Sequence, residues 1–280
     1  MTDINELLAV MKTLRDPQKG CPWDREQDFL SLLPHTLEEV YEVLDAVERN
    51  NHEDVCDELG DLLFQVVFYA QIAEEAGDFD FQAIVEGIVA KLLRRHPHVF
   101  ADELVGNAEQ QADQWEEHKA KERSAKKTAV EPESALDGVA LTLPALIRSV
   151  KLQRRAARVG FDWAKVAQVL DKVEEELAEL REEIAPLLSL SSDLVKSQYA
   201  KKSVSESRVE HELGDLLQAV TNLSRHLDIE PESALRRANQ RFEKRFQRVE
   251  ALCREESLDI AKTDLTIMES FWDKAKSEGL

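Results

Sequence analysis

Eight acidic residues recur in the same arrangement in the two halves of this 280-residue chain. In each half a Glu-x-x-Glu pair is followed by a Glu-x-x-Asp pair. These acids are Glu39, Glu42, Glu58 and Asp61 in the first half, and Glu176, Glu179, Glu212 and Asp215 in the second. Residues three apart on a helix share one face, with Cβ atoms roughly 5–6 Å apart. Two such helices packed together would gather four carboxylates, and four like charges need a cation among them.

The ligand types decide which cation these acids predict. Oxygen-only ligation is typical of Mg²⁺, with Mn²⁺ as a substitute, and waters and substrate phosphates complete the shell. Ferritin-like di-iron sites use Glu-x-x-His, but here position i+3 is acidic in all four motifs and His211 adjoins Glu212. Zinc sites use clustered His or Cys, which this sequence lacks. A solvated acidic face is the alternative for a single pair, and the repetition of the set argues against it.

The helices that must position the acids have recognisable apolar stripes. In the helix around residues 58–69 only Glu58, Asp61 and Gln65 form a narrow polar stripe. A helix that is apolar nearly all round is buried, so we expect its acids to be buried too. We predict that the core stripe of this helix is Leu59, Leu62, Leu63, Val66 and Ala70. In the preceding helix we predict a core stripe of Leu37, Val40, Tyr41 and Leu44, with the acids on the other side.

The hydrophobic period is helical almost throughout, glycine and proline are sparse, and no segment alternates with period two. Five blocks recur in one order, which predicts a duplicated unit. The matched blocks are 20–24 with 160–163, 37–42 with 174–179, 58–63 with 212–217, 91–100 with 241–249, and 115–119 with 272–276. We therefore predict an all-α fold of tandem four-helix-type units.

We place the two units at residues 1–120 and 139–280, joined by a charged linker at 121–138. A Ser-rich insertion at 186–208 separates the acidic helices of the second unit, and its composition predicts a mobile loop. The first unit closes the same gap with a short turn around Asn50, Asn51 and His52.

Composition narrows the class of partner. A formal net charge of −20 argues against nucleic-acid binding, which depends on Lys and Arg neutralising phosphates. An anionic substrate remains possible because metal ions can supply positive charge. Three cysteines without CxxC spacing, no signal-peptide pattern and no apolar stretch long enough to span a bilayer predict a reduced, cytoplasmic protein without a membrane partner.

Basic residues supply candidate phosphate contacts in the second half. Arg241 and Arg245 lie one turn apart on a predicted helix, and Arg can hold phosphate oxygens bidentately. Surface charge lying over the core is the alternative. In the first half Lys91 and Arg95 are the counterparts, but Pro97 should end that helix and displace them. We therefore predict that the first unit binds Mg²⁺ and hydrolyses its substrate poorly.

A tryptophan and a lysine one turn apart close each half of the chain. Trp272 precedes Lys276 in the second half, and Trp115 precedes Lys119 in the first. We interpret Trp272 as a ring that stacks on or borders a base, with core packing as the alternative.

At family level, the chain resembles the MazG nucleoside triphosphate pyrophosphohydrolases, within the all-α NTP pyrophosphatases. The resemblance covers residues 4–120 and 139–280. It rests on the blocks GCPWDREQ, LEEVYEV, DELGDLLFQVVF, RRHPHVF, HELGDLL, RANQRFEKRF and FWDKAK. The long Ser-rich insertion departs from the family pattern but leaves both acidic helices intact.

The resemblance implies Mg²⁺-dependent hydrolysis of NTPs and dNTPs to the monophosphate and pyrophosphate, broad base tolerance, a homodimer and a role in nucleotide-pool house-cleaning. It also implies that the second repeat is the active one, with Glu176, Glu179, Glu212 and Asp215 as metal ligands and catalytic acids. The implied nucleotide contacts are Lys172, Val173, Glu174, Glu175, Glu176, Arg208, Val209, Glu210, His211, Arg241, Phe242, Glu243, Lys244, Arg245, Trp272 and Lys276.

We expect metal-assisted attack of water on a phosphoryl phosphorus, with one acid as general base and pyrophosphate as the leaving group. Two alternatives stay open. One is a dUTP/dCTP-type pyrophosphatase of narrower specificity on the same scaffold. The other is a non-catalytic helical nucleotide-binding or interaction module with a vestigial metal site.

Overall fold

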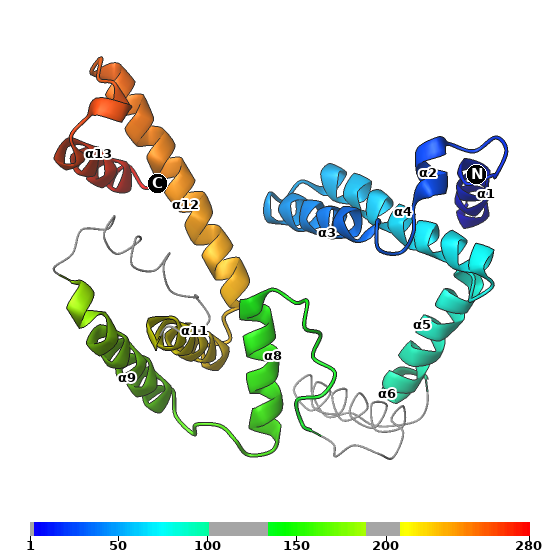
Figure 1. Ribbon diagram of the computed structural model, residues 1–280, viewed down its shortest axis with the longest axis horizontal. Coiled ribbons are helices and arrows are strands. Elements are labelled where there is room, and N and C mark those ends of the chain that lie inside the picture. The colour runs from blue at the N-terminus through cyan, green and yellow to red at the C-terminus, as the bar shows by residue number, and fades with distance from the viewer. Residues whose placement is uncertain (1–2, 101–133, 189–207) are drawn as a thin grey trace. The chain divides into compact units, whose positions relative to one another are not determined.

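The computed structural model describes residues 3–100, 134–188 and 208–280, and every regular element in those ranges is a helix (Figure 1). The predicted all-α fold is confirmed. The chain divides into two compact units, Met1–Lys126 and Lys127–Leu280. This division falls inside the segment predicted as a linker, of which residues 121–133 lie outside the described residues, as do the 115–119 block and most of the insertion, 189–207.

The first unit is built on a helical hairpin. Its helices are α1 (Ile4–Leu14), α2 (Pro22–Glu26), α3 (Leu33–Glu48), α4 (His52–Ala76), α5 (Phe81–Arg95) and α6 (Pro97–Phe100). Asn50 takes a left-handed conformation, with φ of 55°, and the side chain of Asn51 accepts from the backbone N–H of Glu53 at 3.2 Å. Helices α3 and α4 therefore join through the predicted short turn and pack against each other, while α1 and α5 also contact α4.

The buried face of α4 is not the one that the sequence predicted. Met11, Leu32, Val67, Phe68 and Ile72 form the core of the unit, because α1 covers the Val67–Ile72 face. The predicted core stripes are mostly exposed: Leu37, Val40, Tyr41 and Leu44 on α3, and Leu59, Leu63 and Val66 on α4. Leu37 is 55% exposed and Leu59 is 49% exposed, whereas Ala70 is buried as predicted. The hydrophobic period located apolar stripes, but in residues 3–100 of this unit the stripe residues Leu37 and Leu59 stay exposed.

The second unit repeats the acidic hairpin with longer helices around it. Its elements are α8 (Ala145–Arg158), α9 (Val166–Ile184), the short 3₁₀ helix η1 (Ala185–Leu187), α11 (Arg208–His226), α12 (Pro231–Glu255), a second 3₁₀ helix η3 (Ile260–Lys262) and α13 (Leu265–Ser277). Helix α9 packs against α11, and α13 folds back on α12 (Figure 1). Val249, Leu252, Cys253 and Phe271 form the core between α12 and α13.

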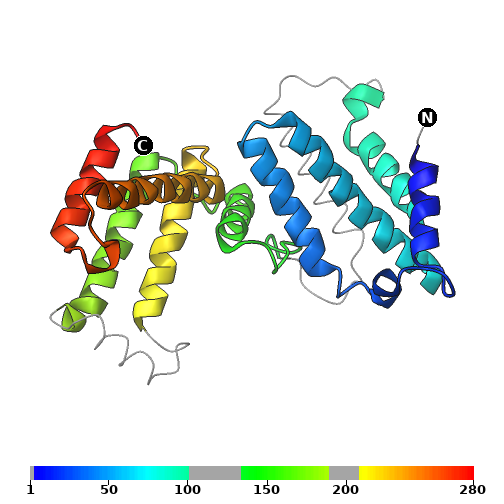
Figure 2. The ribbon, with the colours of Figure 1, turned by 90° about the horizontal axis from the view of Figure 1, so that it is seen from above.

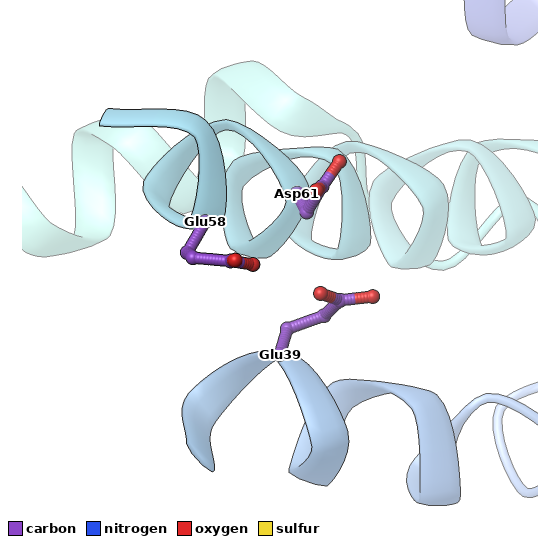
Figure 3. A group of neighbouring side chains, drawn as sticks. All are labelled: Glu39, Glu58 and Asp61. Atoms are coloured by element: carbon purple, nitrogen blue, oxygen red, sulfur yellow. The ribbon is translucent and has the colours of Figure 1, made fainter. Parts of the chain in front are cut away.

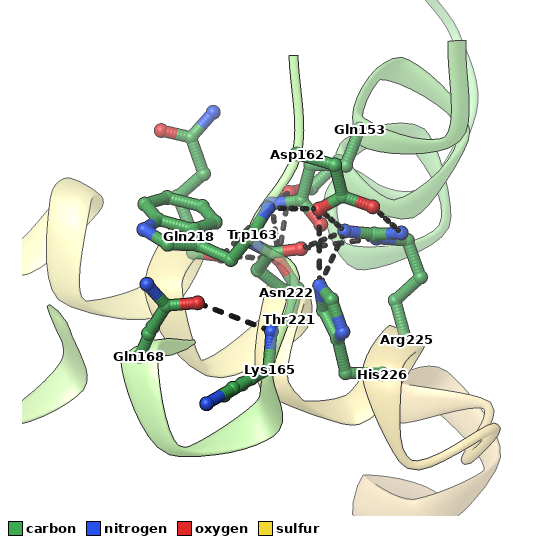
Figure 4. Close-up of polar contacts among 11 residues, drawn as sticks. Gln153, Asp162, Trp163, Lys165, Gln168, Gln218, Thr221, Asn222, Arg225 and His226 are labelled. Atoms are coloured by element: carbon green, nitrogen blue, oxygen red, sulfur yellow. Dashed lines mark hydrogen bonds and ion pairs between the residues drawn. The ribbon is translucent and has the colours of Figure 1, made fainter. Parts of the chain in front are cut away.

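A polar network joins α8, α11 and the segment before α9 (Figure 4). Ser149 and Thr221 share a hydrogen bond of 2.7 Å between α8 and α11. Asp162 accepts from Arg225 at 2.9 Å and lies 3.0 Å from His226 Nε2. Hydrogen bonding from Arg225 lowers the pKa of Asp162, since it stabilises the carboxylate. The network fixes the end of α11 next to the start of α9.

The helix break predicted at Pro97 is confirmed. Helix α5 ends at Arg95 and a separate turn of helix begins at Pro97, whereas α12 runs unbroken through Arg241 and Arg245 (Figure 2). None of the described helices is both long and apolar enough to cross a membrane.

Candidate metal centre

The hairpin of the first unit brings three acids together. Glu39 on α3 faces Glu58 and Asp61 on α4, and each offers a carboxylate oxygen within 4.8 Å of the others (Figure 3). Glu39 and Glu58 are half-buried and Asp61 is exposed. Glu42, the fourth predicted ligand, is exposed and lies outside this group. Three of the four predicted acids therefore offer oxygens close together, and that they bind a metal stays a prediction.

The electrostatics of this first cluster are unfavourable without a cation. Burial raises the pKa of Glu39, and the charges of Asp61 and Glu42 raise it further. Burial and the charges of Glu42 and Asp61 also raise the pKa of Glu58. Among the described residues, no Lys or Arg forms an ion pair with Glu39, Glu58 or Asp61. The ionised cluster is therefore held together against its own repulsion.

The second unit gathers a different three of its four acids. Glu176 and Glu179 on α9 and Glu212 on α11 offer oxygens within 4.8 Å of one another. Glu176 is buried, with 7% of its surface exposed, Glu212 is half-buried and Glu179 is exposed. Asp215 is exposed on α11 and lies outside the group. Burial raises the pKa of Glu179, and the charge of Glu176 adds to the shift.

A lysine partners the second cluster. Lys172 Nζ lies 2.7 Å from Glu176 Oε1 and 2.9 Å from Glu175 Oε1, one turn away on α9. The hydrogen bonds to these two carboxylates raise the pKa of Lys172 above its usual range. The corresponding position in the first unit is His35, whose Nδ1 lies 3.9 Å from Glu38 Oε2. The two clusters therefore differ in the residue one turn before their first acid, which is His35 in the first unit and Lys172 in the second.

The start of α11 carries four predicted nucleotide contacts: Arg208, Val209, Glu210 and His211. Arg208 is exposed, and its guanidinium lies 3.5 Å from Glu183 near the end of α9. This ion pair spans the two helix ends on either side of the insertion. Since exposed ion pairs contribute little to stability, Arg208 remains available to a ligand.

A second group of predicted contacts forms a cluster on α12 and α13. The guanidinium carbon of Arg245 lies 5.8 Å from the ring centroid of Trp272, and the Phe242 and Trp272 centroids are 5.3 Å apart. Phe246, which the sequence did not single out, stacks on Phe242 at 6.1 Å. Its one-turn spacing from Phe242 was the signal available. Trp272 also packs on the α12–α13 core, as the alternative interpretation expected, and its contact with a base stays a prediction.

The remaining predicted nucleotide contacts of this second group lie on α12 and α13, and within the described residues the structure shows no bond between them and the acidic cluster on α9 and α11. Arg241, Glu243 and Lys244 are exposed on α12, and Lys276 pairs with Asp273 at 3.0 Å on α13. In the part of the chain that the structure describes, no hydrogen bond or ion pair links Arg241 or Arg245 to the acids. That both groups contact one nucleotide stays a prediction.

The donor sets fit a hard divalent cation. Each cluster offers three carboxylate oxygens within 4.8 Å, with no His or Cys in either group. Mg²⁺ prefers such oxygen ligands and keeps several waters. The raised pKa values of Glu39, Glu58 and Glu179 have the direction that a bound cation would reverse, because positive charge stabilises the carboxylate form.

One further polar residue adjoins the first cluster. Gln65 is 6% exposed, and its Oε1 atom has no hydrogen-bond partner among the described residues. The sequence placed Gln65 on the polar stripe of α4 with Glu58 and Asp61, but gave it no role.

Comparison with known proteins relates the chain to one enzyme class. A family model described as the MazG nucleotide pyrophosphohydrolase domain matches residues 27–100, which contain the first cluster. The nucleoside triphosphate pyrophosphohydrolase of Escherichia coli strain K12 is 46% identical over 278 residues, covering 99% of this chain and 98% of that protein. The nucleoside triphosphate pyrophosphohydrolase/pyrophosphatase MazG of Thermotoga maritima is 38% identical, covering 97% and 94%. The uncharacterized protein YabN of Bacillus subtilis is 37% identical, covering 96% of this chain and 50% of that protein.

Proposed function

This chain belongs to the MazG family of nucleoside triphosphate pyrophosphohydrolases and is an enzyme of that class, and we propose that its second unit hydrolyses NTPs and dNTPs to monophosphates and pyrophosphate with Mg²⁺. The observation that carries the proposal is the group of Glu176, Glu179 and Glu212, with oxygens within 4.8 Å. In the second unit Lys172 pairs with Glu176 and α12 runs unbroken through Arg245, whereas α5 of the first unit ends at Arg95 and His35 occupies the position of Lys172.

Glu176, Glu179 and Glu212 would hold the metal, with Asp215 one turn further along α11. When bound, Mg²⁺ supplies the positive charge that a triphosphate and an attacking water require. One of the four acids of this unit is the general base. It takes a proton from the water as that water attacks phosphorus, and pyrophosphate leaves.

Two basic residues from different helices bind the phosphate oxygens. Lys172 exchanges its contact with Glu176 for a phosphate oxygen, since a bound metal replaces its charge beside the acids. Arg245 holds phosphate oxygens from α12, and Trp272 borders the base next to it. Glu174, Glu175 and Val173 complete the α9 side of the nucleotide site.

The exposed apolar stripes support a homodimer. In the first unit they include Leu37, Tyr41, Leu59 and Leu63; in the second they include Leu170, Leu177, Leu213, Leu217 and Val220. Contiguous apolar surface of this kind is typical of protein interfaces. A second copy of this chain is the proposed occupant, because both units present the corresponding face of the acidic hairpin. Light scattering should give about twice 31.9 kDa, and Leu37→Glu should shift the protein toward the monomer.

The activity is tested by pyrophosphate release from a panel of ribo- and deoxyribonucleotides with Mg²⁺. We expect turnover of several bases, and loss of turnover in Glu212→Gln. Activity confined to dUTP or dCTP would replace the broad substrate range with a narrower one. Full activity of Glu212→Gln would remove the second cluster from the catalytic centre.

A further inference from the structure

The amide of Gln65 is part of the polar face that carries the acids of the first unit. At about 100° per residue, Glu58, Asp61, Gln65 and Tyr69 fall on one stripe of α4 roughly 80° wide. Gln65 lies ~6 Å along the helix axis from Asp61, at 1.5 Å per residue. The acids and the amide therefore lie on one face of α4, one turn apart.

Contacts between α3 and α4 bracket Gln65 from both ends. On one side Glu39 meets Glu58 and Asp61, with oxygens within 4.8 Å. On the other side Thr36 Oγ1 lies 3.0 Å from the hydroxyl of Tyr69. Gln65 lies between these two cross-helix contacts on the same stripe of α4, and its side chain is buried.

Gln65 Oε1 requires a donor at this place. A buried polar atom without a partner opposes folding, and native structures rarely contain one. The adjacent ionised carboxylates cannot help, since they only accept hydrogen bonds. A water on a divalent cation donates strongly, and Mg²⁺ in a carboxylate site keeps several waters. A hydrated cation among the acids would therefore satisfy the amide and the acids together.

We propose that Gln65 Oε1 accepts a hydrogen bond from a water of the divalent cation that Glu39, Glu58 and Asp61 are expected to hold. This inference goes beyond the proposed function, because the site binds the cation without nucleotide and takes no part in turnover. Groups that hydrogen-bond to the inner ligands of a metal commonly change its affinity 10–100-fold.

The second unit supports this assignment by contrast. The position of Gln65 is occupied there by Ala219, and the position of His35 by Lys172. A lysine therefore neutralises the acids of the second unit, whereas the acids of the first unit have no such partner among the described residues. The amide occurs in the unit whose acids depend on an added cation.

The test measures Mn²⁺ binding to the full chain, by electron paramagnetic resonance of the free ion, without nucleotide. The second centre is silenced with Glu176→Gln and Glu212→Gln. In this background Gln65→Leu should lower Mn²⁺ affinity about 10–100-fold. The melting temperature of the metal-free protein should stay the same or rise, because the unpaired buried oxygen is removed. Gln65→Met, with an unbranched side chain, repeats the test if leucine disturbs packing.

Gln71 provides the matched control on the same helix. It is also buried, but its Nε2 donates to Glu75 Oε1 at 3.1 Å. Gln71→Leu should lower the melting temperature and leave Mn²⁺ affinity within about twofold, because it breaks a formed hydrogen bond away from the acids. The proposal is overturned if both Gln65 variants retain the background Mn²⁺ affinity, or if each destabilises the metal-free protein as much as Gln71→Leu. Since turnover is not measured, neither outcome bears on the proposed catalytic centre.

Discussion

The two acidic clusters come from the same pair of motifs, Glu-x-x-Glu and Glu-x-x-Asp, but they gather different members of these motifs and have different neighbours. In the first, burial and the repulsion of neighbouring carboxylates raise the pKa values of Glu39 and Glu58. In the second, Lys172 lies 2.7 Å from the buried Glu176 and already neutralises part of the charge. A repeated ligand motif therefore does not give two equivalent sites. The residue one turn before the first acid differs between them, with His35 in the first unit and Lys172 in the second, and we expect a metal in the second unit to compete with the lysine for Glu176.

The helix interfaces behind the clusters differ in the same way. Val67 and Phe68 pack α4 into an apolar core, whereas Thr221 and Asn222 occupy the corresponding positions of α11. Thr221 bonds Ser149, and Asn222 accepts from Arg225 at 3.0 Å. Hydrogen bonds have strict geometry, and apolar packing tolerates small shifts. The second unit thus positions its acidic helix by directional contacts.

The largest expected difference between the clusters is in turnover. Glu212→Gln should lower kcat at least ~100-fold, because loss of a metal ligand removes charge stabilisation worth several kcal/mol. Glu58→Gln, the equivalent change in the first unit, should lower kcat by less than about threefold. Pyrophosphate release at saturating Mg²⁺ measures both. A greater loss in Glu58→Gln would move the catalytic centre to the first unit.

The unbroken helix α12 gives the next difference. Arg245→Ala should raise the KM for NTP about 10–100-fold, the range expected from charged hydrogen bonds worth ~1.5–3 kcal/mol. Arg245→Lys should recover only part of this loss, because a point charge lacks the bidentate fork. Arg95→Ala on α5 is the matched change in the first unit and should leave KM near wild type. Full rescue by lysine would reduce the role of Arg245 to charge alone.

Replacement of Lys172, the lysine that pairs with the second cluster, should produce a smaller change in metal affinity and KM. Lys172→Met should tighten Mn²⁺ binding in the absence of nucleotide about 3–10-fold, since no ammonium then competes for Glu176. The same variant should raise the KM for NTP, because the lysine also serves the phosphate. His35→Met should leave both quantities nearly unchanged. Calorimetric titration with and without a non-hydrolysable NTP analogue separates the two effects, and equal behaviour of the two variants would contradict the comparison.

The smallest expected effect is on stability against pH. The folded-state pKa of Glu39 is raised above its ordinary value of 4.5. Its contribution to stability is therefore fully present below that value and is lost as pH rises through the raised pKa. The melting temperature of the metal-free protein should fall on the order of 1–3 °C across this window. Glu39→Gln should reduce the fall of the melting temperature with pH, and saturating Mg²⁺ should abolish that fall. An unchanged slope in the variant would assign the effect to other groups.

Several features of this protein could be predicted from its sequence, because they depend on local interactions along the chain. The break at Pro97 follows because proline cannot continue a helix, and the turn at Asn50 and Asn51 follows because asparagine tolerates left-handed backbone and caps helices. The acids shared a face because the helical period fixes side-chain direction. The all-α fold and the family followed from the same short-range patterns and from the matched blocks.

The tertiary structure alone decided which of the apolar stripes is buried and which acids meet. Leu37 and Leu59 satisfy the helical period as well as Val67 does, but α1 packs over Val67. Likewise Glu42 and Asp215 occupy the predicted faces, yet the packing of each hairpin leaves them outside the clusters. Spacing along a helix fixes direction within that helix. Which residues become buried depends on which other element packs against the helix, and the same holds for an unpaired amide such as that of Gln65. The spacing of residues along one helix does not identify that packing partner.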